Sequence, residues 1–144
     1  MTLGLKTGKP LLLAAVLAAA AGGAAAQEPG KAGVTIELSD AEPVGEACKL
    51  SFVVQNGHKA DIGKAVYETV LFDDQGQVAR LTLLDFQDLP AGRLRVRQFQ
   101  FPHTCHGISR VLINGADTCT GDGLPDGACS RGLVLSSRVM ELAG

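Results

Sequence analysis

The segment HTCHGISRVLINGADTCTGDGLPDGAC, residues 103–129, holds three of the four cysteines and two of the three histidines of the chain. Its middle, residues 108–113, is rich in β-branched and apolar types and predicts a strand that Asn114-Gly115 would end. The fourth cysteine, Cys48, opens another alternating run, KLSFVVQN. Cysteines beside strand-like runs in a short chain are typical of a small β-sandwich held by disulfides.

Four cysteines allow three disulfide connectivities. Their order favours Cys48 with Cys105, placed like the bridge between the sheets of immunoglobulin-like domains, and Cys119 with Cys129 around a Gly/Asp/Pro loop. Two immunoglobulin hallmarks are missing, because the chain has no Trp and His103 stands where a Tyr would precede the second cysteine. The term immunoglobulin-like (Ig-like) therefore describes an architecture here and not membership of that family.

Residues 1–26 have the pattern of a secretory signal peptide. Lys6 and Lys9 precede an apolar core, residues 11–20, and the small residues 24–26 form a cleavage site. The apolar run is shorter than the roughly 20 residues that a membrane span needs. We therefore expect a periplasmic or secreted protein without a membrane span after cleavage, in a compartment where cysteines pair.

The rest of the chain divides into a flexible polar leader, residues 27–33, and one all-β domain, residues 34–144. Acidic residues exceed basic ones, and loss of Lys6 and Lys9 would increase this excess, so no basic footprint for nucleic acid is expected. Turn signals separate short alternating runs, which predicts an antiparallel Ig-like β-sandwich of about seven strands. The strands are expected at residues 34–38, 48–54, 64–72, 78–86, 93–101, 108–113 and 132–136, and Pro43 and Gly45 are expected to break the chain between the first two.

The layout resembles that of small periplasmic Ig-like proteins of Gram-negative bacteria, a group without an assigned activity. The resemblance implies fold and compartment only. It extends over nearly all of the domain and lies in C-x-L-x-F-V-V-x-N (residues 48–56), V-L-F-D-D-x-G (70–76), L-P-A-G (89–92) and C-x-G-I-x-R-V-L-I-N (105–114).

Arg93, Arg95 and Arg97 alternate with apolar residues in RLRVRQFQF, residues 93–101. If Leu94 and Val96 face the core, the three guanidinium groups form an exposed positive row, and the later phenylalanines require a bulge near Arg97-Gln98. Such a row would bind carboxylates or phosphates of a partner. The alternative is a solvated face paired across the sheet with acids such as Glu68.

Two groups of residues invite a metal interpretation. His103, Cys105 and His106 suit zinc or copper, unless Cys105 is half of a disulfide and the histidines, three positions apart, point to opposite faces of a strand. Asp117, Asp122 and Asp126 resemble a calcium loop, although Thr118, Thr120 and Cys129 occupy ligand positions of such a loop, so carboxylates that it needs are absent.

Catalysis has little support in the sequence. The chain has no G-x-S-x-G, C-x-x-C or H-E-x-x-H motif, although a site assembled from separate loops would leave no local motif. We therefore expect a non-catalytic module without a cofactor, associating with another protein of the cell envelope. The alternative is a periplasmic metal-binding protein that uses the aspartates or the histidines named above.

Overall fold

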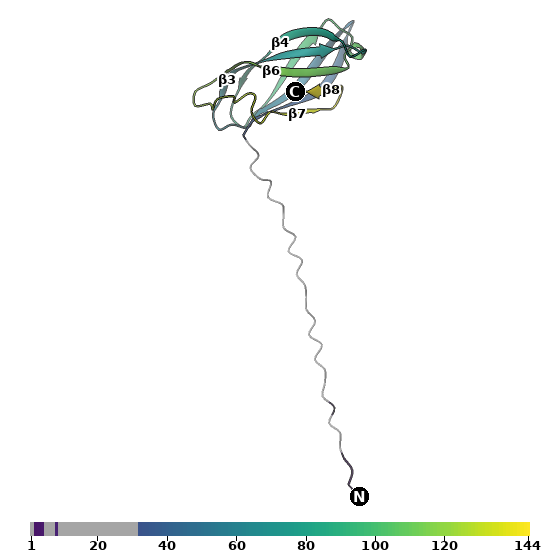
Figure 1. Ribbon diagram of the computed structural model, residues 1–144, viewed down its shortest axis with the longest axis vertical. Coiled ribbons are helices and arrows are strands. Elements are labelled where there is room, and N and C mark those ends of the chain that lie inside the picture. Colours follow the sequence, from purple (N-terminus) through teal and green to yellow (C-terminus); the bar gives the residue numbers. More distant parts are fainter. Residues whose placement is uncertain (1, 5–7, 9–31) are drawn as a thin grey trace.

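The structure is a computed structural model that describes residues 2–4, 8 and 32–144. The predicted signal peptide and leader therefore lie almost entirely outside the described residues. The domain is a sandwich of two four-stranded sheets (Figure 1), which confirms the predicted all-β class. Its elements are β1 (Val34–Val44), β2 (Ala47–Asn56), β3 (Ile62–Phe72), β4 (Val78–Leu89), β5 (Leu94–Phe101), the 3-10 turn η1 (Cys105–Gly107), β6 (Arg110–Thr120), β7 (Val134–Ser137) and β8 (Glu141–Ala143).

One sheet has the order β5-β2-β1-β7 and the other has the order β4-β3-β6-β8. Neighbouring strands are antiparallel except for β7 on β1 and β8 on β6, which are parallel. The predicted antiparallel arrangement therefore holds for β1 to β6, but not for the short strands β7 and β8. Strand β6 ends at the end of the sandwich where β1 begins, and the loop at residues 121–133 crosses there to the other sheet, so β7 runs in the same direction as β1. Strand β8 was not expected from the sequence.

Strand β1 continues through the predicted break and ends only at Val44. A register shift between Leu38 and Asp40 marks a bulge in its pairing with β2. Because β7 pairs with β1 only as far as Leu38, one side of β1 is open beyond that point. Pro43, which has no N–H to donate, is tolerated at such an edge position. The prediction of a break at Pro43 was therefore wrong, whereas Gly45, with a φ of 58°, lies in the two-residue turn that separates β1 from β2, as the sequence predicted.

Strand β6 passes through Asn114-Gly115, where the sequence predicted an end. The register with β3 moves from Ile113 opposite Thr69 to Gly115 opposite Glu68, which leaves Asn114 as the extra residue of a bulge. The Asn114 amide donates a hydrogen bond to the Glu68 carboxylate. Asn114-Gly115, which the sequence predicted as the end of a strand, therefore forms part of a bulge inside a longer strand.

The orientation predicted for β5 was also wrong. Its pairing with β2 runs without a shift from Cys48 opposite Phe101 to Gln55 opposite Leu94, so no bulge is present. The side of the strand that carries Phe101 therefore also carries Arg97 and Arg95. Leu94 and Val96 are on the opposite, outer face and are exposed. The edge position of β5 permits this arrangement, because a long arginine side chain can cover apolar surface and still reach polar groups at the rim.

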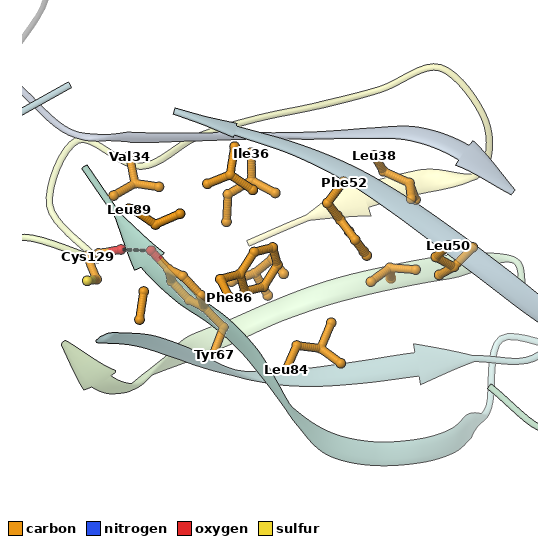
Figure 2. Close-up of a cluster of buried hydrophobic side chains, with 14 of the residues drawn as sticks. Val34, Ile36, Leu38, Leu50, Phe52, Tyr67, Leu84, Phe86, Leu89 and Cys129 are labelled. Atoms are coloured by element: carbon orange, nitrogen blue, oxygen red, sulfur yellow. Dashed lines mark hydrogen bonds between the residues drawn. The ribbon is translucent and has the colours of Figure 1, made fainter. Parts of the chain in front are cut away.

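The core lies between the sheets (Figure 2) and has an aromatic centre. Phe86 of β4 meets Phe52 of β2 edge-on at a ring-centroid distance of 5.6 Å and Tyr67 of β3 at 5.5 Å. Phe99 of β5 approaches the same Phe86 ring at 5.3 Å. Edge-to-face contacts of this kind stabilise by about 0.5–1.5 kcal/mol beyond burial, so the four rings fix how the sheets stack.

Both predicted disulfides are confirmed, Cys48–Cys105 and Cys119–Cys129. The first differs in detail from the expected bridge between two facing strands. Cys48 lies in β2, but Cys105 lies in η1, within the connection that carries the chain from β5 to β6. The bond therefore ties a central strand to the crossover between the two sheets.

Candidate functional site

Two long loops meet at one end of the sandwich, which we call the loop end. They are residues 57–61, between β2 and β3, and residues 121–133, between β6 and β7. Cys119 near the end of β6 bonds to Cys129 and closes the second loop at its base. The Tyr67 hydroxyl, from the core, donates a 2.8 Å hydrogen bond to the Cys129 carbonyl, the dashed line of Figure 2. Burial raises the pKa of Tyr67 above its usual range, so the phenol remains a neutral donor.

Asn56 and His58 join the first loop to its surroundings. The buried Asn56 amide donates to the carbonyls of Ala60 (2.9 Å) and Leu89 (2.8 Å), and its oxygen accepts from the His58 main-chain N–H at 2.9 Å. His58 Nε2 lies 2.7 Å from the Ala128 carbonyl in the second loop. Buried polar groups bonded in this way order the loop end from within.

Two hollows open at the loop end. The His58 cavity, of about 450 Å³, lies between the two loops and is lined by His58, Asp126 and Arg131 among others. The Asp61 cavity, of about 520 Å³, is lined by Asp61 and Asp122 together with Gly63, Thr120 and Gly121. The Asp61 carboxylate already accepts the Ala91 N–H at 2.8 Å, which gives it a role in holding a turn.

The three aspartates of the candidate calcium loop are separated by the fold. Asp117 lies in β6, because that strand is longer than the sequence predicted, whereas Asp122 lines the Asp61 cavity and Asp126 the His58 cavity. Across residues 32–144 no three His, Cys, Asp or Glu side chains are grouped so as to hold a metal ion. The aspartates thus do not form one coordination sphere in this structure.

His103 and His106 lie at the other end of the sandwich, beside the Cys48–Cys105 disulfide. Cys105 is bonded to Cys48 and offers no thiolate. His106 is exposed in η1, and His103 precedes that turn, so the prediction that they lie in a strand was wrong. The Nδ1 atom of His103 is buried and has no hydrogen-bond partner among the described residues.

The three arginines of residues 93–97 do not form one exposed row. Arg97 spans the gap between the edge strands β5 and β4, where its Nε donates to the Phe86 carbonyl at 2.6 Å and its Nη2 to the Asp88 carbonyl at 2.9 Å. Its side chain is only 15% exposed. Arg95 donates to the carbonyl of Leu94, and Arg93 is exposed before β5 begins. Arg97 is therefore a structural contact between the two sheets.

Exposed aliphatic residues lie on the outer face of the sheet β4-β3-β6-β8 and were not predicted from the sequence. Leu81 and Leu83 of β4 are 59% and 52% exposed. Leu81 is opposite Val70 of β3, which is in turn opposite Leu112 of β6, so an apolar row crosses three strands. The sequence contained an indication of this face, because apolar residues occur at both the odd and the even positions of VARLTLLDF, and one of these two sets has to face outwards.

These features define a two-sheet β-sandwich with two disulfides and a tethered loop end. Among solved structures the fold is similar to IrmA from Escherichia coli, with a TM-score of 0.56, 17% sequence identity, and coverage of 75% of this chain and 92% of IrmA. This similarity shows a shared fold alone. No protein-family model and no curated protein matches the sequence. Within the described residues no helix is long and apolar enough to cross a membrane.

Proposed function

We propose that the protein is an exported, non-catalytic, Ig-like module that acts in the periplasm or outside the cell by binding another protein of the cell envelope. Export is supported by the two disulfides, which account for all four cysteines, since oxidising compartments favour such bonds. The strand orders β5-β2-β1 and β4-β3-β6 support the Ig-like description, because they correspond to E-B-A and C′-C-F of variable-type domains.

The observation that carries the binding proposal is the apolar outer face of β4-β3-β6. An antiparallel sheet that faces water normally presents polar side chains outwards. Here Val70 is only 5% exposed although it lies outside the core cluster, because apolar neighbours on the outer face cover it. Aliphatic side chains that gather on an exposed face are typical of protein interaction sites.

Charged residues surround this face. Lys64 and Asp85 lie 3.9 Å apart at one end of it, and Arg110 and Glu141 form a 2.8 Å ion pair at the other. An apolar centre with a polar rim is the usual anatomy of a protein interface. On the other sheet, Arg93, just before β5, and Arg95, on that edge strand, are proposed as a second contact, suited to an acidic partner.

Site-specific photocrosslinking in the native cell envelope tests the binding proposal. A photoreactive amino acid at Leu83, on the apolar face, should give a discrete adduct with a second protein. The same amino acid at Gln75, in the exposed hairpin between β3 and β4, is the matched control and should not give that adduct. Identical products at both positions, or no adduct at Leu83, would contradict the proposal. An adduct of twice the chain mass would identify the partner as a second copy instead.

Export is tested separately by intact mass spectrometry of the protein from its native host. The expected species begins at Gln27 and has all four cysteines oxidised. A chain that retains residues 1–26, or that carries free thiols, would contradict an exported module.

A further inference from the structure

We propose that the His58 cavity is a binding site for a small zwitterion of the α-amino-acid type, with its carboxylate on Arg131 and its ammonium group on Asp126 and His58. This ligand is a different class of partner from the protein proposed above. It uses a different part of the molecule, because the apolar face lies on β4-β3-β6 and the cavity lies at the loop end.

The walls of the cavity are held before any ligand arrives. The Ala128 and Cys129 carbonyls are bonded to His58 and Tyr67, respectively, and Cys129 is also bonded to Cys119. The turn that carries Arg131 is closed by its own N–H, which donates to the Gly127 carbonyl at 2.8 Å. A site ordered in advance loses little entropy on binding, which favours weakly held small ligands.

The charges in the cavity are of opposite sign and do not neutralise each other. Asp126 and Arg131 both line it, but they are not within ion-pair distance of each other. Within the described residues neither forms an ion pair with any other group. A simple anion would meet the repulsion of Asp126, and a simple cation that of Arg131. A ligand that carries both charges, separated by a short bond path, satisfies both side chains.

His58 adds a hydrogen-bond acceptor to the cavity. Its Nε2 faces the Ala128 carbonyl, which can only accept, so Nε2 carries the hydrogen in the neutral ring. The other nitrogen, Nδ1, then has a lone pair, and the two hydrogen bonds of His58 within the described residues involve its main-chain N–H and its Nε2 instead. His58 is 8% exposed and is one of the residues that line the cavity, so a ligand N–H is a donor that suits its free lone pair.

The size and the remaining lining agree with a small amphiphilic molecule. A volume of about 450 Å³ falls in the lower part of the range of small-molecule sites, roughly 300–1,000 Å³. Ala32, Pro125 and Ala128 contribute apolar surface next to the charged groups. An aliphatic side chain on the zwitterion would contact these three residues.

Nuclear magnetic resonance of the full, disulfide-bonded protein tests the proposal with L-leucine as the probe. Leucine should cause saturable shifts of the backbone amide signals of His58, Gly127 and Arg131. Two analogues each lack one charge: 4-methylpentanoate has no ammonium group, and 3-methylbutylamine has no carboxylate. Each should bind at least about tenfold more weakly, which corresponds to about 1.4 kcal/mol.

Two substitutions of exposed residues test the two charges of the site one at a time. Arg131→Gln and Asp126→Asn should each weaken leucine binding at least about tenfold, while the amide spectra confirm an unchanged fold. Arg138→Gln is the matched control, because Arg138 is exposed and pairs with Glu37 away from the cavity, at 2.9 Å. The proposal is wrong if leucine shifts none of these amides, if the single-charge analogues bind as well as leucine, or if both cavity variants retain its affinity.

Discussion

The Arg97 guanidinium on β5 donates a 2.6 Å hydrogen bond to the main-chain carbonyl of Phe86 on β4, and so joins the edge strands of the two sheets. A second bond reaches the Asp88 carbonyl at 2.9 Å, while the Asp88 carboxylate is 3.5 Å away. These are charge-assisted bonds from a side chain that is mostly withdrawn from water. They also occupy carbonyls of an edge strand that would otherwise be free to pair with another chain.

Replacement of Arg97 by Gln should therefore lower the free energy of unfolding by about 1.5–3 kcal/mol, the usual contribution of hydrogen bonds to a charged group. Urea denaturation measures this loss. Arg93→Gln is the control and should change stability by less than about 0.5 kcal/mol, because Arg93 is exposed. Equal effects of the two substitutions would show that the Arg97 contact contributes no more than a surface charge.

Tyr67→Phe should destabilise the protein by about 1–3 kcal/mol, because the buried Cys129 carbonyl loses its donor. The loss of stability should also be greatest in the loop at residues 121–133. Amide hydrogen exchange in residues 121–133 should become faster than in the strands, since the hydroxyl connects that loop to the core. Uniformly faster exchange throughout the sandwich would contradict a tethering role.

Stability should fall at alkaline pH for the same reason. The pKa of Tyr67 is raised by burial, so the folded state holds its phenolic proton more tightly than the unfolded state. Its contribution is complete below the unfolded pKa of about 10 and is lost as the pH rises above it. Tyr67 is the only tyrosine of the chain, so phenolate absorbance reports on it directly. We expect this absorbance to appear together with unfolding; ionisation within an intact fold would contradict the prediction.

Local signals in the sequence were enough to locate the long strands, although not their ends, and to pair the cysteines. Alternation identified the half-buried face of β2, and chain order pointed to the correct partner for Cys48. Bulges were not visible, because Asn114-Gly115 has the same composition whether it ends a strand or lies within one. The orientation of β5 was missed for a similar reason. An arginine that covers the core rim is indistinguishable in sequence from a solvated one.

The loop end was beyond sequence reasoning because its contacts are distant along the chain. His58 and Ala128 are separated by 70 positions, and Tyr67 and Cys129 by 62. No pattern within a short window relates them. The sequence placed Asp126 in a candidate calcium loop, whereas the fold brings it to a cavity with Arg131 and His58. The type of a residue suggests which groups it can bind, but tertiary contacts decide which residues lie beside it.

The two disulfides should differ in what they stabilise. The chain-entropy model gives about 4 kcal/mol for the Cys48–Cys105 bridge, with its separation of 57 residues, and about 3 kcal/mol for the Cys119–Cys129 bridge, with its separation of 10. Replacing either pair by Ala and measuring urea denaturation checks this order. Loss of the shorter bridge should in addition accelerate hydrogen exchange around the His58 cavity. A larger global loss from the Cys119–Cys129 pair would contradict the expected order.

Gln87 has a backbone φ of 61°, in the left-handed region that residues other than glycine rarely adopt. The Asp85 carboxylate accepts the Gln87 N–H at 2.8 Å, and the register of β4 against β3 shifts at this point. This turn of the backbone lies between the Phe86 and Asp88 carbonyls that receive Arg97. The unusual conformation at Gln87 therefore belongs to the same link between the two sheets.

Gln87→Val should cost about 1–2 kcal/mol, because a side chain branched at Cβ is especially unfavourable in the left-handed region. The matched control is Gln100→Val on β5, an exposed strand position opposite Lys49, where valine has a favourable β propensity and stability should change by less than about 0.5 kcal/mol. Gln87→Gly should be tolerated, since glycine adopts positive φ without strain. Urea denaturation of the three variants measures these changes in the free energy of unfolding. If valine is as harmless at position 87 as at position 100, the left-handed backbone at Gln87 is not a constraint on the fold.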